Sequence, residues 1–143
     1  MRRAAAALGL ALLLCGCGGL RTGPVERPDP YPDQSTPEAA WHTFLWASKT
    51  GDLPVLASVT MFRLRNEGLE APLREHGPEK TAAMARETWA DAAVLDAGWD
   101  ALGEALGYLR VTMSTRALPR RRYVYSFVRR PDGWALSARL ELH

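Results

Sequence analysis

The spacing of apolar residues changes along this chain, and the change restricts the folds open to it. Between residues 36 and 50, large apolar side chains recur every three or four positions, as at Trp41, Phe44 and Leu45. Between residues 109 and 142 they alternate with other side chains. The first spacing places apolar groups on one face of a helix, and the second on one face of a strand. The sequence therefore predicts an α+β fold, with N-terminal helices packed on a C-terminal antiparallel sheet.

The helical region has clear start and stop signals. Thr36 and Pro37 supply a hydroxyl cap and a proline in the first turn, and Gly51 provides a stop. Asp52 is placed to cap a second, shorter helix. Residues 61–77 contain breaks that obscure any period.

A second helical stripe follows residue 78, with apolar positions separated by steps of four and three. It favours a helix from about residue 79 into the high nineties, broken near Gly98 and Gly103. A strand around Val94 to Trp99 is the alternative. The stripe consists of Met84, Thr88, Ala92, Leu95, Trp99, Leu102 and Leu106.

The last third predicts three strands joined in a meander, with a turn at Pro131, Asp132 and Gly133 between the last two. One face of this sheet is expected to be apolar and covered by the helices. Its predicted residues are Leu109, Val111, Met113, Tyr123, Tyr125, Phe127, Trp134, Leu136, Ala138, Leu140 and Leu142. The opposite face is expected to carry Arg110, Arg116, Arg122 and Arg139.

The N-terminus has the pattern of an export signal. Arg2 and Arg3 precede an apolar run at residues 4–14, which at 11 residues is shorter than the roughly 20 needed to span a bilayer. Leu14-Cys15-Gly16-Cys17 follows and resembles the lipobox of bacterial lipoproteins. The resemblance implies cleavage before Cys17 and attachment of acyl chains such as palmitate to it. An ordinary secretory leader is the alternative.

The expected organisation is a lipoprotein signal peptide at 1–16, a lipidated cysteine with a proline-rich tether at 17–35, and one α+β domain at 36–143. Two or three acyl chains on Cys17 would hold the protein on a membrane. The predicted location is the bacterial cell envelope. Because Gly18 follows Cys17, the outer membrane facing the periplasm is favoured in a cell with two membranes.

The first two helices carry a further resemblance. Residues 35–60 begin Ser-Thr-Pro-Glu, continue through an aromatic-Leu pair, and reach a Gly-Asp turn before the second helix. This run resembles the opening of the nuclear transport factor 2-like superfamily. The resemblance implies a cone-like arrangement in which helices cover a curved sheet. It does not define the chemistry, because one fold supports many functions.

Several classes of function lack a sequence signal. His42, His76 and His143 lie in separate segments without metal-ligand spacing, so neither a metal nor another cofactor is expected. No nucleophile or phosphate-binding motif is present. The abundance of Arg among the basic residues matches a compositional bias, and no nucleic-acid partner is expected.

The preferred prediction is a non-catalytic binding or accessory module, with an enzyme held as the alternative. The mouth of the cone, lined by Trp46, Tyr123 and Tyr125, is the candidate site for a small apolar ligand, and an envelope protein is the other candidate partner. Ketosteroid-isomerase-like members of the superfamily imply the enzyme alternative. It would require Asp96 or Asp100 to lie beside a tyrosine in a closed cavity.

A third hypothesis concerns the Arg-rich face of the sheet. Arg110, Arg122 and Arg139 are its candidate anion-binding residues, and their guanidinium groups suit envelope polymers or lipid headgroups. The competing interpretation is a solvated face that offsets the acidic helical half. Residues 26–104 contain 14 acidic and 7 basic side chains, whereas residues 105–143 contain 2 and 8.

Overall fold

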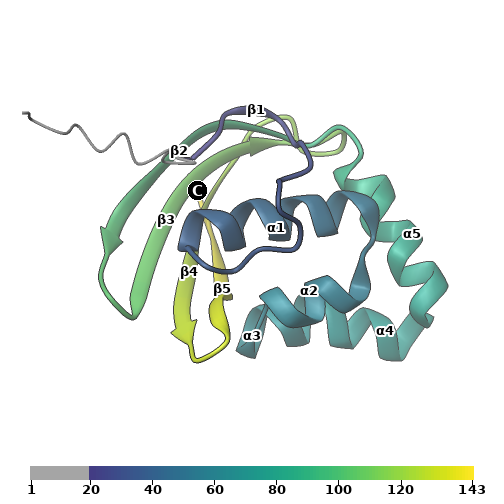
Figure 1. Cartoon of the computed structure of the whole chain (residues 1–143). Helices are drawn as coiled ribbons and strands as arrows, with labels where there is room; N and C mark the ends of the chain where they lie inside the picture. Colours follow the sequence, from purple (N-terminus) through teal and green to yellow (C-terminus); the bar gives the residue numbers. More distant parts are fainter. Residues whose placement is uncertain (1–19) are drawn as a thin grey trace, which may run out of the picture.

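The computed structural model describes residues 20–143, in which helices pack on a five-stranded antiparallel sheet of order β1-β2-β3-β4-β5 (Figure 1). The predicted signal peptide and Cys17 lie outside the described residues. The strands are β1 (Gly23–Pro24), β2 (Ala93–Leu102), β3 (Leu106–Ser114), β4 (Arg121–Arg130) and β5 (Gly133–Leu142). The helices are α1 (Pro37–Thr50), α2 (Leu53–Val59), α3 (Phe62–Arg65), the π-helical η1 (Asn66–Glu70), α4 (Ala71–His76) and α5 (Pro78–Trp89).

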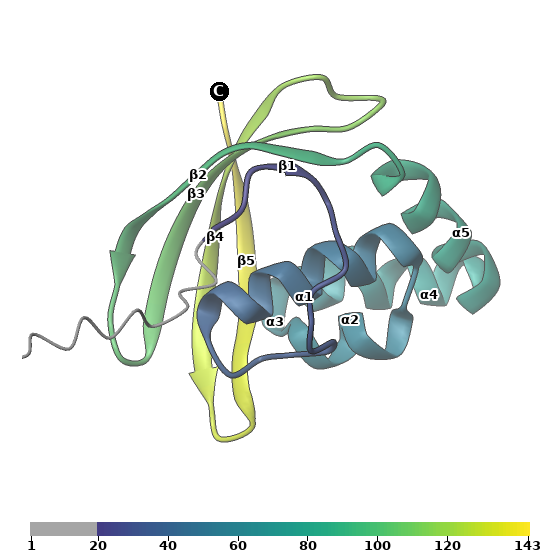
Figure 2. The same ribbon diagram turned by 45° about the horizontal axis from the view of Figure 1, so that its top comes forward.

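The sheet curves around α1, while α2, α3 and α4 lie alongside that helix and α5 lies near its C-terminal end (Figures 1 and 2). The concave face and α1 form the core, where Trp41, Tyr125 and Phe127 are fully buried. Residues 20–143 contain this core, which is what an independently folding domain requires. The predicted α+β class, with helices on an antiparallel sheet, is confirmed.

The two N-terminal helices begin where the sequence predicts. The Thr36 hydroxyl accepts a hydrogen bond from the Ala39 N–H at 3.0 Å and caps α1. Gly51 ends α1 in the left-handed conformation with φ of 68°, and a Cβ there would lie 2.7 Å from the Ala82 carbonyl oxygen. The Asp52 carboxylate caps α2. Gly51 therefore lets the end of α1 approach α5 closely.

The expected helix through the high nineties is wrong beyond Trp89, and the strand alternative is confirmed. Irregularities in the pairing of β2 with β3 follow Val94 and Trp99. Such irregularities change which face of the sheet a side chain occupies. The apolar residues of β2 therefore recur at steps of three and four, a spacing that resembles that of a helix. Leu95 and Leu102 are consequently each 46 % exposed instead of packed.

The segment predicted to be a tether lies against the domain over its described part. Gly23 and Pro24 pair with β2, and Val25 is buried in the core. The Tyr31 hydroxyl donates a 2.8 Å hydrogen bond to Asp52 Oδ2. Val25, inside the predicted tether, therefore contributes to the core. Backbone pairing, a buried apolar side chain and single hydrogen bonds together hold a proline-rich segment that has no period of its own.

Candidate ligand-binding cavity

An irregularity in the last hairpin decides which side chains of β5 face the helices. Ser126 pairs with Ala138 and Phe127 with Leu136, so Ser137 is an extra residue in β5. One extra residue reverses the facing of the side chains that follow it. Arg139 consequently lies opposite the buried Tyr125 on the concave face, and Leu140 is 64 % exposed on the outer face.

This reversal corrects two predictions made from simple alternation. Arg139 does not share the outer face with Arg110 and Arg122, and Leu140 does not join the core. Glu141 follows the same reversal: it is opposite Tyr123 and binds Arg121 at 3.0 Å. The concave face therefore holds both a cation and an anion on β5.

A cavity of about 230 Å³ lies between the concave face, the second half of α1 and the helices that follow. Phe44, Trp89 and several aliphatic side chains provide its apolar wall, and Arg139 reaches it from β5. The full lining is Phe44, Ser48, Leu56, Thr60, Arg63, Leu64, Glu67, Gly68, Leu69, Ala85, Trp89 and Arg139. An apolar concavity with a few polar groups is the usual form of a small-molecule site.

Two irregular backbone features border this cavity. Phe62 has a φ of 52°, a left-handed value that is unusual for a bulky residue, and its side chain is 67 % exposed. The π-helical turn η1 follows, and Glu67, Gly68 and Leu69 from it line the cavity. Both features are uncommon and recur at functional sites. The wall formed by α3 and η1 is therefore the strained part of the lining.

The polar groups of the lining differ in how they are compensated. Arg63 and Glu67 form an exposed ion pair at 2.7 Å, and the Ser48 and Thr60 hydroxyls donate to carbonyls within their own helical segments. Arg139 has no carboxylate partner within residues 20–143; its guanidinium carbon lies 5.1 Å from the centroid of the Tyr123 ring. Its charge is therefore balanced only by an aromatic face and solvent.

Tyr125 lies beneath Arg139. Its side chain is fully buried, and its hydroxyl has no hydrogen-bond partner of good geometry among the described residues. Burial raises the pKa of this hydroxyl to about 12, and the charge of Arg139 offsets part of the increase. The hydroxyl is therefore a protonated donor at neutral pH.

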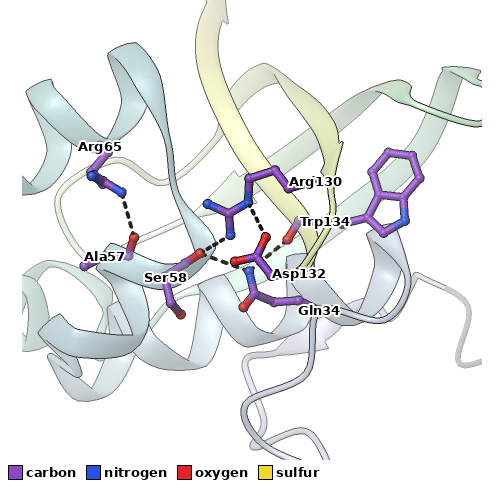
Figure 3. Close-up of polar contacts among 7 residues, drawn as sticks. All are labelled: Gln34, Ala57, Ser58, Arg65, Arg130, Asp132 and Trp134. Carbon is purple, nitrogen blue, oxygen red and sulfur yellow. Dashed lines mark hydrogen bonds and ion pairs between the residues drawn. The ribbon is translucent and has the colours of Figure 1, made fainter.

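A set of hydrogen bonds at the end of α2 holds β5 against the helices (Figure 3). The Ser58 carbonyl accepts from Arg130 Nη2 at 2.6 Å and from Gln34 Nε2 at 3.0 Å. Gln34 also donates to the Trp134 carbonyl at 2.9 Å, and Arg65 donates to the Ala57 carbonyl at 3.3 Å. These donors satisfy carbonyls that the end of a helix leaves open, and they link the N-terminal segment, α2 and the β4–β5 hairpin.

The three residues predicted to line the mouth of the cone are not among those that line this cavity. Trp46 is half-buried, with the Lys49 ammonium 5.9 Å from its ring centroid. Tyr123 and Tyr125 are core residues with ring centroids 6.1 Å apart. Both tyrosines instead interact with Arg139, which lines the cavity. Its guanidinium lies over the Tyr123 ring, and its charge offsets part of the increase that burial causes in the pKa of the Tyr125 hydroxyl.

Apart from Arg139, the charged groups named for the two alternative hypotheses lie on the outer face or at its edge. Asp96 is exposed, and Asp100 binds Arg110. Arg122 donates to the His143 carbonyl at 3.3 Å. The described hydrogen bonds place neither Asp96 nor Asp100 on a tyrosine, which is the geometry that the isomerase-like alternative required.

Sequence reasoning missed the cavity residues contributed by α3 and η1. Leu64 and Leu69 both line the cavity and are five positions apart, a step that neither the α-helical nor the strand template contains. That spacing, next to Gly68, is the only signal we find in the sequence for a π-helical turn.

Within residues 20–143, no group of three or more His, Cys, Asp or Glu side chains is arranged to hold a metal ion. No helix in the same range has the length and apolar character needed to cross a membrane. Comparison of the chain with models of protein families, with curated proteins and with solved structures finds no match.

Proposed function

We propose that this chain is a membrane-anchored envelope lipoprotein whose domain binds a small, largely apolar molecule in the cavity between α1, η1, α5 and β5. The observation that carries the proposal is the cavity itself: about 230 Å³, with Phe44, Trp89 and aliphatic side chains forming the apolar half of its lining. An engineered apolar cavity of about 150 Å³ binds benzene, so the volume is sufficient for a ligand.

The rest of the proposal draws on the sequence. The run at residues 35–60 supports a nuclear transport factor 2-like domain, and the helices that cover a curved antiparallel sheet are compatible with it. Such a domain would act as a carrier, sensor or accessory module on the membrane. Binding is favoured over catalysis because Asp100, a candidate acid, is bound to Arg110 outside the cavity.

The binding proposal is tested with residues 20–143 and 1-octanol, an uncharged probe of suitable size. We expect saturable binding by calorimetry and a rise in Tm with octanol concentration. Ala85→Leu adds three carbons to the cavity wall on α5. Overpacking of about 1–3 kcal/mol would weaken octanol binding roughly ten- to a hundredfold.

Ala83→Leu is the matched control, because Ala83 lies on the same helix but is exposed. It should leave octanol affinity unchanged. Equal affinities in the wild type and in both variants would place octanol outside the cavity. Absence of octanol binding in a folded wild-type domain would contradict the proposal.

The anchor is tested separately in the full chain expressed in a bacterium. Cys17→Ala removes the thiol that would carry lipid, so the protein should move from the membrane fraction to the soluble fraction or remain unprocessed. Cys15→Ala is the matched control and should keep the protein lipidated. Membrane association of Cys17→Ala with normal processing would contradict the anchor.

A further inference from the structure

We propose that the ligand of the cavity is a monocarboxylate with a short apolar body, and that Arg139 holds its carboxylate at the mouth. This inference rests on the proposed binding function and adds the chemical class of the ligand. Its experiment separates the two, because an uncharged probe reports on the cavity and a charged one on Arg139.

The position of Arg139 depends on an irregularity in the strand. With regular alternation in β5, Arg139 would lie on the outer face with Arg110. The extra residue at Ser137 instead turns Arg139 toward the helices, where it lines a cavity with both apolar and polar walls. Arg139 remains exposed there, so a ligand that enters the cavity meets its guanidinium at the mouth. Within residues 20–143 no carboxylate forms an ion pair with it.

The charges around the cavity favour a single negative group. Arg63 and Glu67 neutralise each other at 2.7 Å, which leaves the charge of Arg139 as the uncompensated one in the lining. A carboxylate matches the planar guanidinium with two parallel hydrogen bonds. A cation would be repelled by Arg139, and a dianion would keep one charge unpaired beside the apolar wall.

Tyr123 and Tyr125 restrict the orientation of the Arg139 guanidinium. The Tyr123 ring supports the guanidinium at 5.1 Å and limits its orientations. The fully buried Tyr125 hydroxyl lacks a hydrogen-bond partner of good geometry and lies where the charge of Arg139 affects it. A hydroxyl held in this way can orient Arg139 or donate to a bound carboxylate.

The volume limits the apolar body of the ligand. If about 150 Å³ accepts the six carbons of benzene, about 230 Å³ accepts roughly nine non-hydrogen atoms. Octanoate has ten, and its carboxylate would lie at the open mouth beside Arg139. Octanoate and 1-octanol therefore form a matched pair of probes, alike in their apolar chain and different in charge.

The test measures both probes by calorimetry on residues 20–143 and on two variants. We expect the wild type to bind octanoate roughly ten- to a hundredfold more tightly than octanol, as a charge-assisted hydrogen-bonded pair provides. Arg139→Gln should abolish this preference, because it should weaken octanoate binding far more than octanol binding. Arg110→Gln, on the outer face, should alter neither affinity. The preference should also shrink as salt is raised.

Each result decides one of the two proposals. If octanol and octanoate bind the wild type equally, and Arg139→Gln changes neither, the carboxylate inference is overturned while the cavity function stands. If Arg139→Gln weakens both probes alike, Arg139 supports the cavity and does not select charge, which also overturns the inference. If a folded domain binds neither probe, the proposed binding function is contradicted, and the carboxylate inference that rests on it is overturned as well.

Discussion

The two ends of helix α1 meet the same sheet in different ways. Near its start, Trp41 packs on Phe127 with ring centroids 6.5 Å apart, and Phe127 packs on Trp99 at 5.1 Å. We call this aromatic contact the filled end. In the second half of α1, Phe44 and Ser48 face the cavity of about 230 Å³ that Trp89 and Arg139 also line. We call this region the cavity end.

Under the proposed function, stability and binding are separated along one helix. At the filled end, Trp99 Nε1 also donates a 3.0 Å hydrogen bond to Glu38, which ties β2 to the first turn of α1. The cavity end instead contains the unusual φ of Phe62, the π-helical η1 and the Arg139 guanidinium, which has no carboxylate partner within residues 20–143. Close packing stabilises the first region, and the second retains the space and charge on which the binding proposal depends.

The largest expected effect comes from truncating the filled end. Trp41→Ala removes a completely buried indole whose ring contacts Phe44, Tyr125 and Phe127. Loss of a buried aromatic side chain costs about 3–5 kcal/mol in the free energy of unfolding. Urea denaturation of residues 20–143 measures this loss as a lower midpoint with an unchanged slope.

Trp89→Ala makes the same substitution at the cavity end. Trp89 is half-buried and touches Phe44 edge-on with centroids 5.8 Å apart, so the expected loss is smaller, about 1–2 kcal/mol. Losses of equal size at the two positions would contradict the distinction between the filled and cavity ends. A loss at Trp89 with weaker octanol binding would strengthen it.

The sequence predicted the filled end better than the cavity end, for a physical reason. The start of α1 and the alternation at Tyr125 and Phe127 are local patterns, and each matches a regular template. The cavity end depends on the extra residue at Ser137 and on the π-helical turn of η1. Both break the regular period, so the alternation placed Arg139 on the wrong face.

The N-terminal segment shows a second limit of sequence patterns. Its prolines correctly exclude a helix or a long strand, but they do not exclude packing. The contacts that hold it are made singly and with distant parts of the chain, such as Tyr31 to Asp52 and Gln34 to Trp134. No local period encodes such contacts.

The smallest expected effect concerns Tyr125, whose ring contacts Trp41 of the filled end and Phe44 of the cavity wall. Its pKa is raised from the 10.0 of an unperturbed tyrosine to about 12 in the folded chain. The folded state therefore keeps this proton where the unfolded chain loses it, so its contribution to stability is complete below pH 10 and decreases as the pH rises toward 12. By pH 11 the loss amounts to about 1 kcal/mol.

Tyr125→Phe removes this ionisation together with a buried hydroxyl that lacks a good partner. We expect the stability of the variant at pH 7 to remain within about 1 kcal/mol of the wild type, and its decline between pH 9 and pH 11 to be shallower. Urea denaturation across that range measures both quantities, and Tyr108→Phe on the outer face controls for the loss of an exposed hydroxyl. Tyr31, whose pKa is also raised by burial and by Asp52, is present in every protein compared and cancels in the difference. Parallel pH profiles for the wild type and Tyr125→Phe would mean that this hydroxyl ionises as readily in the folded chain as in the unfolded one, and would contradict its burial between the filled and cavity ends of α1.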